Sequence, residues 1–207
     1  MISRRGLLAA GTAGLLAGCV DDDGPAATVG DAGQEWHGTY LDEPGQPLPD
    51  ITLTDHHGQD YRLADDPSTP VVMLFFGYTN CPDVCPGIVA DMATARRRLS
   101  EPDPGEVSLI LVTTDPARDT PEALSQYLER VDPDFTGLTG DLDVIVPAAA
   151  SLGIDITEGK QLPSGGYEVD HGTYVLGFGP DRRMRIVWND ATPAEMREDL
   201  ERLIHGT

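Results

Sequence analysis

Positive charge is the scarcest property of this sequence. The chain of 207 residues has only 14 Lys and Arg against 35 Asp and Glu, a formal net charge of −21. This balance argues against nucleic acid as a partner, because phosphates repel such a surface. It also predicts a halophilic archaeon as the source, because molar salt shortens the screening length to about 3 Å and removes most of the self-repulsion. The alternative is an ordinary acidic secreted protein.

The sequence also lacks a long hydrophobic run. The apolar stretch at 6–18 is shorter than the roughly 20 residues that a membrane-spanning helix needs. It follows Arg4 and Arg5, as in a twin-arginine export signal, and it precedes Cys19 in a sequence that resembles a lipobox. We therefore expect residues 1–19 to be a signal and Cys19 to carry a lipid at the outer face of the cytoplasmic membrane. The alternatives are an uncleaved anchor and cleavage without a lipid.

Cysteine is scarce as well, with three in the whole chain. Since Cys19 belongs to the predicted signal, Cys81 and Cys85 form a pair in an oxidising compartment. Residues 20–47 are rich in Asp, Gly and Pro and have little apolar periodicity, so they are predicted to be a flexible acidic tether. The folded domain is then expected at 48–207.

The pattern within this domain is that of an α/β protein. The continuous apolar run at 70–76 indicates a strand buried on both faces, and VSLILVTTD at 107–115 indicates a second buried strand; each is followed by a segment with helical periodicity. A β-hairpin is predicted around the turn at 56–59, a helix at 144–152, a second hairpin at 173–188, and a terminal helix that starts at the capping-box sequence Thr192-Pro-Ala-Glu. This order predicts a thioredoxin-like fold with a central, mostly parallel sheet flanked by helices.

The two cysteines of the domain lie in the sequence FFGYTNCPDVCPGI, between the first buried strand and the first helix. Proline disfavours helical geometry in the residue before it, which predicts that both cysteines belong to a loop. Pro86 suits a first helical position, so Cys85 is expected at the helix N-terminus, where a thiolate is stabilised. A disulfide staple would close so short a loop that its effect is at most about 2 kcal/mol. A redox pair or a soft metal site is the stronger alternative.

A metal site with two thiolates needs a further ligand, and five histidines are available. His37 lies in the predicted tether, His205 next to the C-terminus, and His56 and His57 in a polar turn. His171 stands in VDHGTYVLGF, just before a predicted strand and next to a glycine that permits close approach of another backbone.

Four segments of the chain resemble the Sco/SenC family of copper proteins: FFGYTNCPDVCP, LVTTDPARDTPEAL, FTGLTG and VDHGTYVLGFGPD. The resemblance covers about residues 48–205. It implies a thioredoxin-like fold, with Cys81, Cys85 and His171 as copper ligands. Two thiolates and one imidazole favour three-coordinate Cu(I). With Cu(II), the two negative charges of the thiolates balance the charge of the ion. Many relatives have histidine where this chain has Asn80 directly before the first cysteine.

The family likeness implies a metallochaperone that helps to assemble the copper site of a respiratory oxidase, by copper delivery, by thiol reduction, or by both. Its partner would be the copper-site subunit of that oxidase. The alternatives are a metal-independent thiol:disulfide oxidoreductase, with Cys81 and Cys85 as the redox pair, and a zinc-stabilised binding module. Asp119 or Thr120 is expected to cap the helix that follows. Asp115, which precedes a proline, is either a group beside the site or an ordinary turn residue, and it is left out of the ligand set.

Overall fold

The computed structural model describes residues 36–100, 103–161, 167–171 and 173–206, with the backbone alone for 103, 158–161 and 167–171. The predicted signal, Cys19 and the first part of the predicted tether lie outside the described residues, so these predictions are not tested. Among the described helices, none has the length and the apolar character needed to cross a membrane.

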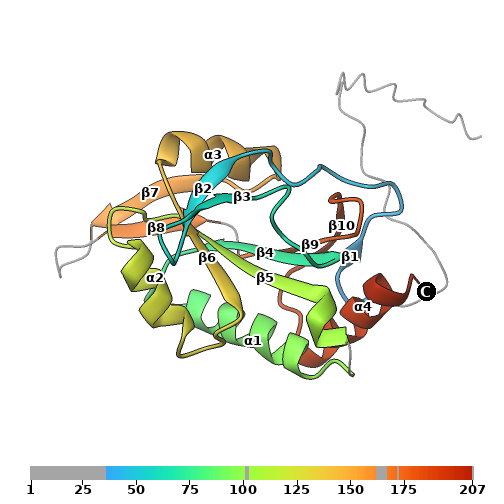
Figure 1. The fold of residues 1–207 in the computed structure, drawn as a ribbon. Coiled ribbons are helices and arrows are strands. Elements are labelled where there is room, and N and C mark those ends of the chain that lie inside the picture. Colours follow the sequence, from blue (N-terminus) through green and yellow to red (C-terminus); the bar gives the residue numbers. More distant parts are fainter. Residues whose placement is uncertain (1–35, 101–102, 162–166, 172, 207) are drawn as a thin grey trace, which may run out of the picture.

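An eight-stranded mixed sheet forms the centre of the described part of the chain (Figure 1). Its strand order is β1-β10-β9-β4-β5-β6-β2-β3. The strands of this sheet are β1 (Thr39–Tyr40), β2 (Thr52–Asp55), β3 (Asp60–Arg62), β4 (Val71–Gly77), β5 (Val107–Thr113), β6 (Phe135–Thr139), β9 (Val175–Phe178) and β10 (Met184–Trp188). A separate hairpin pairs β7 (Ile156–Gln161) with β8 (Tyr167–His171).

Within the described residues, four α-helices cover the two faces of the sheet. They are α1 (Cys85–Arg97), α2 (Pro121–Leu128), α3 (Leu142–Ser151) and α4 (Pro193–His205), and a short 3₁₀ helix, η1 (Asp103–Glu106), precedes β5. Figure 1 shows α1 and α4 on one side of the sheet and α3 on the other. This arrangement confirms the predicted α/β class.

The continuous apolar run of β4 is explained by these two covered faces. Val71, Met73 and Phe75 pack in one core with side chains of α1, α2 and α4. The alternate residues, Val72, Leu74 and Phe76, pack in a second core with side chains of α3. Because successive side chains of a strand point to opposite faces, both sets must be apolar. Each such buried side chain contributes roughly 1.5–3 kcal/mol.

The sheet is less parallel than the sequence predicts. Only β4–β5 and β5–β6 are parallel pairs within the described sheet, and its outer pairs are antiparallel. The reason is that both predicted hairpins, β2–β3 and β9–β10, join the sheet as edge extensions rather than lying over it. The parallel centre still places the ends of β4, β5 and β6 at one edge, where ligands bind in open α/β sheets.

The tether was predicted to span residues 20–47, but the last part of this range belongs to the folded domain. Thr39 and Tyr40 pair with β10 as an edge strand, and Leu41 is buried. The buried carboxylate of Asp199 accepts hydrogen bonds from the backbone N–H groups of His37 and Gly38 at 2.9–3.2 Å. Residues 36–47 therefore belong to the folded domain.

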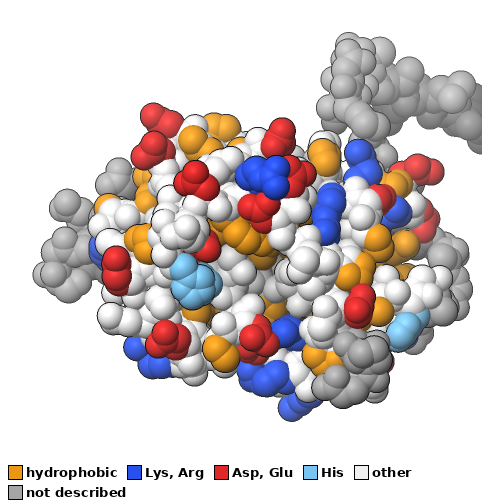
Figure 2. Space-filling model, viewed as in Figure 1, with side chains coloured by type: hydrophobic (Ala, Val, Ile, Leu, Met, Phe, Trp, Pro, Cys, Tyr) orange, Lys and Arg blue, Asp and Glu red, His pale blue; other side chains and the backbone are white. Residues whose placement is uncertain are grey.

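Local signals placed most helix ends correctly. The capping box at Thr192 and Glu195 starts α4, as predicted. The helix α3, predicted at 144–152, runs from Leu142 to Ser151 with Pro147 inside it. Carboxylates are spread over the face of the molecule in Figure 2, with fewer basic groups between them.

Candidate metal centre

The two cysteines lie where the chain passes from the central strand β4 to α1. Cys81 is in the loop and partly exposed, and its backbone N–H donates to the carbonyl of Tyr78 at 3.3 Å. Cys85 is the first residue of α1, with Pro86 after it, and its exposed fraction is 1%. The predicted order of strand, loop and helix is therefore confirmed, but the prediction that both cysteines belong to the loop is wrong for Cys85, which lies in the first turn of α1.

Both cysteines are thiols rather than a disulfide. Burial raises the pKa of the Cys85 thiol, and a side-chain hydrogen bond with Cys81 raises that pKa further. Burial therefore opposes the stabilisation of a Cys85 thiolate that was expected from the helix N-terminus. The apolar surroundings of the sulfur outweigh the helix dipole, because desolvation penalises the charged form.

A buried carboxylate holds the cysteine loop. Asp119 accepts hydrogen bonds from the backbone N–H of Thr79 at 2.9 Å and from its hydroxyl at 2.5 Å. It also accepts a hydrogen bond from the Thr113 hydroxyl, at the end of β5, at 2.7 Å. Of the two predicted cap residues, Asp119 and Thr120, the cap of α2 is Thr120, whose hydroxyl accepts from the N–H of Ala123 at 3.3 Å.

Asp115 lies in a turn beside this network, as predicted, and is fully buried. Its carboxylate forms an ion pair with Arg118, whose guanidinium lies 5.7 Å from the ring centre of Tyr78. Arg118 thereby links the turn after β5 to the residue that follows β4. On the same loop, the Asn80 amide donates to the Thr79 hydroxyl at 3.1 Å.

Tyr127 is a residue of this centre that sequence reasoning missed. It lies on α2 and packs against the core that contains Cys85, as does Cys81. Its hydroxyl is buried and has no hydrogen-bond partner among the described residues. Its sequence position is on the same helical stripe as Leu124 and Leu128, which predicts a core residue and gives no sign of the nearby sulfurs.

The third predicted ligand is placed by its backbone only. His171 is the last residue of β8 and pairs in register with Ile156 on β7, whose side chain packs against the core that contains Cys85. Figure 1 shows the β7–β8 hairpin at the edge of the molecule where β5 and β6 end. The side chain of His171 lies outside what the structure describes, so its predicted ligand role is not tested. Among the described side chains, no three His, Cys, Asp or Glu gather as a metal site.

Two other histidines differ from their predicted surroundings. His56 is in the β2–β3 turn, but its Nδ1 accepts a hydrogen bond from the backbone N–H of Gly137 at 3.2 Å. Burial lowers the pKa of this imidazole. His37 was predicted to lie in the tether but belongs to the folded domain, where its Nε2 lies 2.9 Å from the carboxylate of Glu198.

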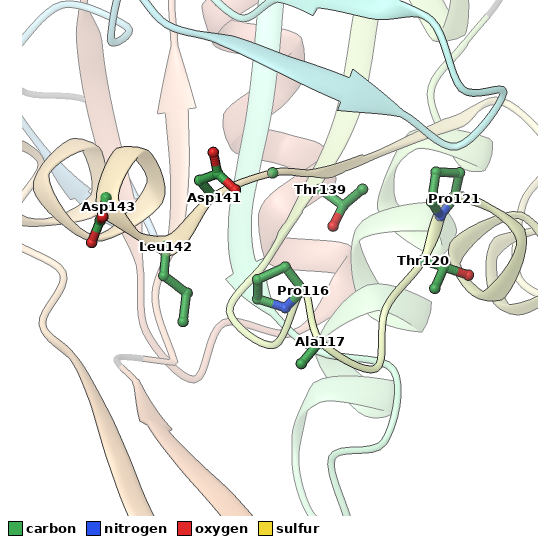
Figure 3. A pocket seen from close by; sticks show the side chains of 9 residues that line it. Pro116, Ala117, Thr120, Pro121, Thr139, Asp141, Leu142 and Asp143 are labelled. Atoms are coloured by element: carbon green, nitrogen blue, oxygen red, sulfur yellow. The ribbon is translucent and has the colours of Figure 1, made fainter.

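An open groove lies at the ends of the parallel strands, between the turn after β5 and the start of α3 (Figure 3). Its volume is about 590 Å³, and it is lined by Pro116, Ala117, Thr120, Pro121, Thr139, Gly140, Asp141, Leu142 and Asp143. One side of the groove is formed by the segment between β5 and α2, which also carries Asp115 and Asp119. The groove therefore lies next to the segment whose Asp119 holds the cysteine loop.

A sequence model of the SCO1/SenC family matches residues 42–205, which is most of the chain. The chain belongs to the SCO1/SenC family. The mitochondrial SCO2 homolog of Bos taurus is 32% identical over 154 residues, which make up 74% of this chain and 58% of that protein. The chain thus spans somewhat more than half the length of that curated SCO relative.

Solved Sco structures share the fold. Bradyrhizobium japonicum ScoI with copper bound is 31% identical, with a TM-score of 0.66 over 77% of this chain and 99% of that chain. BsSco, described as a member of the Sco family of cytochrome c oxidase assembly proteins, is 22% identical, with a TM-score of 0.64 over 81% of this chain and 99% of that chain. These similarities confirm the predicted thioredoxin-like fold class.

Proposed function

We propose that this SCO1/SenC protein binds one copper ion as cargo and assists the assembly of the copper site of a cytochrome oxidase. The ligands would be Cys81, Cys85 and His171. The single observation that carries this proposal is the pair of neighbouring thiols on a loop that is hydrogen-bonded to Asp119. The 31% identical ScoI of Bradyrhizobium japonicum, which shares the fold, has copper bound.

The donor set fits the metal. Two sulfurs in hydrogen-bond contact are soft ligands that suit Cu(I), and binding replaces the thiol proton that burial retains on Cys85. An imidazole from His171 would complete a three-coordinate site. Such a site leaves the ion open to ligands of a receiving protein, which is what a copper donor requires.

Cys81 is the sulfur that a partner reaches first, because it is partly exposed while Cys85 is buried. The same difference supports a second role, the reduction of a disulfide in the receiving subunit. In that role Cys81 would attack the partner disulfide, and Cys85 would then resolve the mixed disulfide and leave the partner as a dithiol.

The cellular setting belongs to the proposal as well. Export through a twin-arginine-type signal and a lipid on Cys19 would hold the domain at the outer face of the membrane, beside the oxidase. Residues 20–35 would then form the tether that precedes the folded domain. Mass spectrometry of the native mature protein tests this directly: a diacylglyceryl-modified Cys19 at its N-terminus is the expected result, and an unmodified N-terminus elsewhere would contradict it.

Copper transfer tests the function. The Cu(I)-loaded protein is mixed with the reduced, metal-free copper domain of an oxidase subunit, separated by size, and both fractions are assayed for copper. Transfer in wild type and its absence with Cys81→Ser would support delivery. If no copper moves, but the metal-free thiol form reduces an oxidised copper domain, the protein is an oxidoreductase instead.

A further inference from the structure

Four large hydrophobic side chains are exposed in the described part of the chain, and we call them the apolar rim. They are Val84, Leu142, Val144 and Tyr174, each between 36% and 42% exposed. Val84 stands between the two cysteines. Leu142 and Val144 belong to the first turn of α3, which follows β6, and Tyr174 directly precedes β9. Exposed apolar side chains that are scattered singly need no explanation, but a group of them marks a contact site.

The sheet brings the apolar rim to the edge that carries the cysteine loop. β9, β4, β5 and β6 are consecutive neighbours in the strand order. The parallel strands β4, β5 and β6 end at this edge, and β9 begins there, because it is antiparallel to β4 with Val175 opposite Phe75. Neighbouring strands are about 4.8 Å apart, so the three intervals from β9 to β6 span roughly 15 Å. One docked protein is wide enough to cover this distance.

The groove of Figure 3 forms part of the same surface. Leu142 lines it from α3, and Pro116 and Ala117 line it from the turn after β5. That turn continues to Asp119, which holds the cysteine loop. The groove therefore offers a recess beside the cysteine loop for a side chain of a docked protein.

The charges beside the apolar rim are negative. Three exposed carboxylates adjoin it in the chain: Asp83, Asp141 and Asp143. In the loops that follow β4, β5 and β6 and in the described residues that precede β9, the one basic side chain is Arg118, which is ion-paired with a buried carboxylate of its own turn. A second copy of this chain or an anionic membrane would bring like charges together at this surface. The complementary partner is a protein with an apolar patch bordered by Lys and Arg.

We propose that the apolar rim is the docking surface for the protein that receives copper, and that this protein presents such a patch. Because Val84 stands between the two cysteines, the docked protein covers the cysteine loop and excludes water from it. The nature of the cargo rests on the proposed function, but the docking contact does not. The apolar contact persists in molar salt, whereas the charged border acts mainly in dilute buffer.

The test measures docking separately from copper binding. The probe is the reduced, metal-free copper domain of an oxidase subunit from the same organism, titrated calorimetrically with the reduced, metal-free, full-length protein in molar KCl. The variants are Leu142→Ser and Tyr174→Ser, at the two sides of the apolar rim. Leu203→Ser is the matched control, because Leu203 lies on α4 in a cleft with the β9–β10 turn, at the opposite edge of the sheet. Cu(I) dissociation constants and melting temperatures are measured for every variant.

Leu142→Ser and Tyr174→Ser are each expected to raise the dissociation constant of the complex about tenfold, as for the loss of an apolar anchor in an interface. Their Cu(I) dissociation constants and melting temperatures should equal those of wild type, because both side chains are exposed. Leu203→Ser should leave docking unchanged.

The acidic border is tested by Asp143→Lys. This variant should slow association with the same probe in dilute buffer and have little effect in molar KCl, because charge steering is screened by salt. Faster association of Asp143→Lys would show that the partner's border is acidic, and it would overturn the assigned chemistry of the partner.

Wild-type docking in both serine variants would overturn the inference, and so would docking that disappears in molar KCl. A dimer of the protein alone that Leu142→Ser dissociates, seen by light scattering, would identify a second copy as the occupant and would also overturn it. If the serine variants weaken docking but wild type transfers no copper to the probe, the proposed function fails and the docking surface stands. If wild type neither binds the probe nor transfers copper, both are overturned.

Discussion

The carboxylate of Asp119 holds Thr79 by two hydrogen bonds, one from the backbone N–H at 2.9 Å and one from the hydroxyl at 2.5 Å. Thr79 stands two residues before Cys81, and Asp119 belongs to the segment between β5 and α2. This contact joins the loop after β4 to the loop after β5, so that the position of the first sulfur depends on a carboxylate that lies 40 residues after Thr79 along the chain.

Replacement of Asp119 by alanine should therefore destabilise the domain and loosen the cysteine loop. The change leaves two hydroxyls and one backbone N–H without their acceptor, a loss of about 2–4 kcal/mol in the free energy of unfolding. Urea unfolding measures this loss. Glu122→Gln, an exposed carboxylate on α2, is the control and should change stability by less than about 0.5 kcal/mol. Equal stability of the two variants would show that the Asp119 contacts do not hold the loop.

A second buried carboxylate secures the N-terminal segment of the domain. Asp199 accepts hydrogen bonds from Gly38 N–H at 2.9 Å and from the indole of Trp188 at 2.8 Å, and it also bonds to His37 and Arg202. Asp199→Ala should cost about 2–4 kcal/mol and shift tryptophan emission to longer wavelength, because Trp188 loses its partner. Glu198→Gln, which weakens only the surface contacts of this carboxylate with His37 and Arg197, should cost less than about 1 kcal/mol. A native emission spectrum in Asp199→Ala would contradict this role.

Copper affinity should depend on pH because of Cys85. Burial raises the pKa of this thiol, so it carries its proton in the metal-free protein between about pH 6 and 8. Cu(I) must displace that proton, so the apparent association constant should rise by about tenfold per pH unit for this site alone. Competition titrations at several pH values measure the slope. A pH-independent affinity would mean that Cys85 is not a ligand.

Salt should stabilise the folded protein. At a net charge of −21 the carboxylates repel one another, and in dilute buffer this repulsion acts over roughly 30 Å, compared with about 3 Å at molar salt. Thermal unfolding in dilute buffer should therefore occur at a markedly lower temperature than in molar KCl. A melting temperature that does not depend on salt would argue against the halophilic source that the composition predicts.

Elements with strong local patterns could be predicted from the sequence. The apolar run of β4, the turn of the β2–β3 hairpin and the capping box of α4 each carry their signal within a few residues. The site could be predicted as far as the cysteine loop, because two prolines next to two cysteines restrict the backbone there.

Features that depend on distant contacts could not be predicted. The edge strand β1 has two residues and is defined by its pairing with β10. The roles of Asp119 and Asp199 depend on donors far away in the chain, and an acidic residue just before a helix or within one gives no sign of them. The raised pKa of Cys85 likewise results from tertiary packing, which sequence reasoning about the helix N-terminus does not include.

The most direct test of the central claim is the Cu(I) dissociation constant of the reduced protein, measured by chelator competition for wild type, His171→Ala, Cys81→Ser and the control His57→Ala. The account predicts one tightly bound ion in wild type and in His57→Ala, and at least tenfold weaker binding in the other two variants. Wild-type affinity in His171→Ala would contradict a site built from two sulfurs and this imidazole.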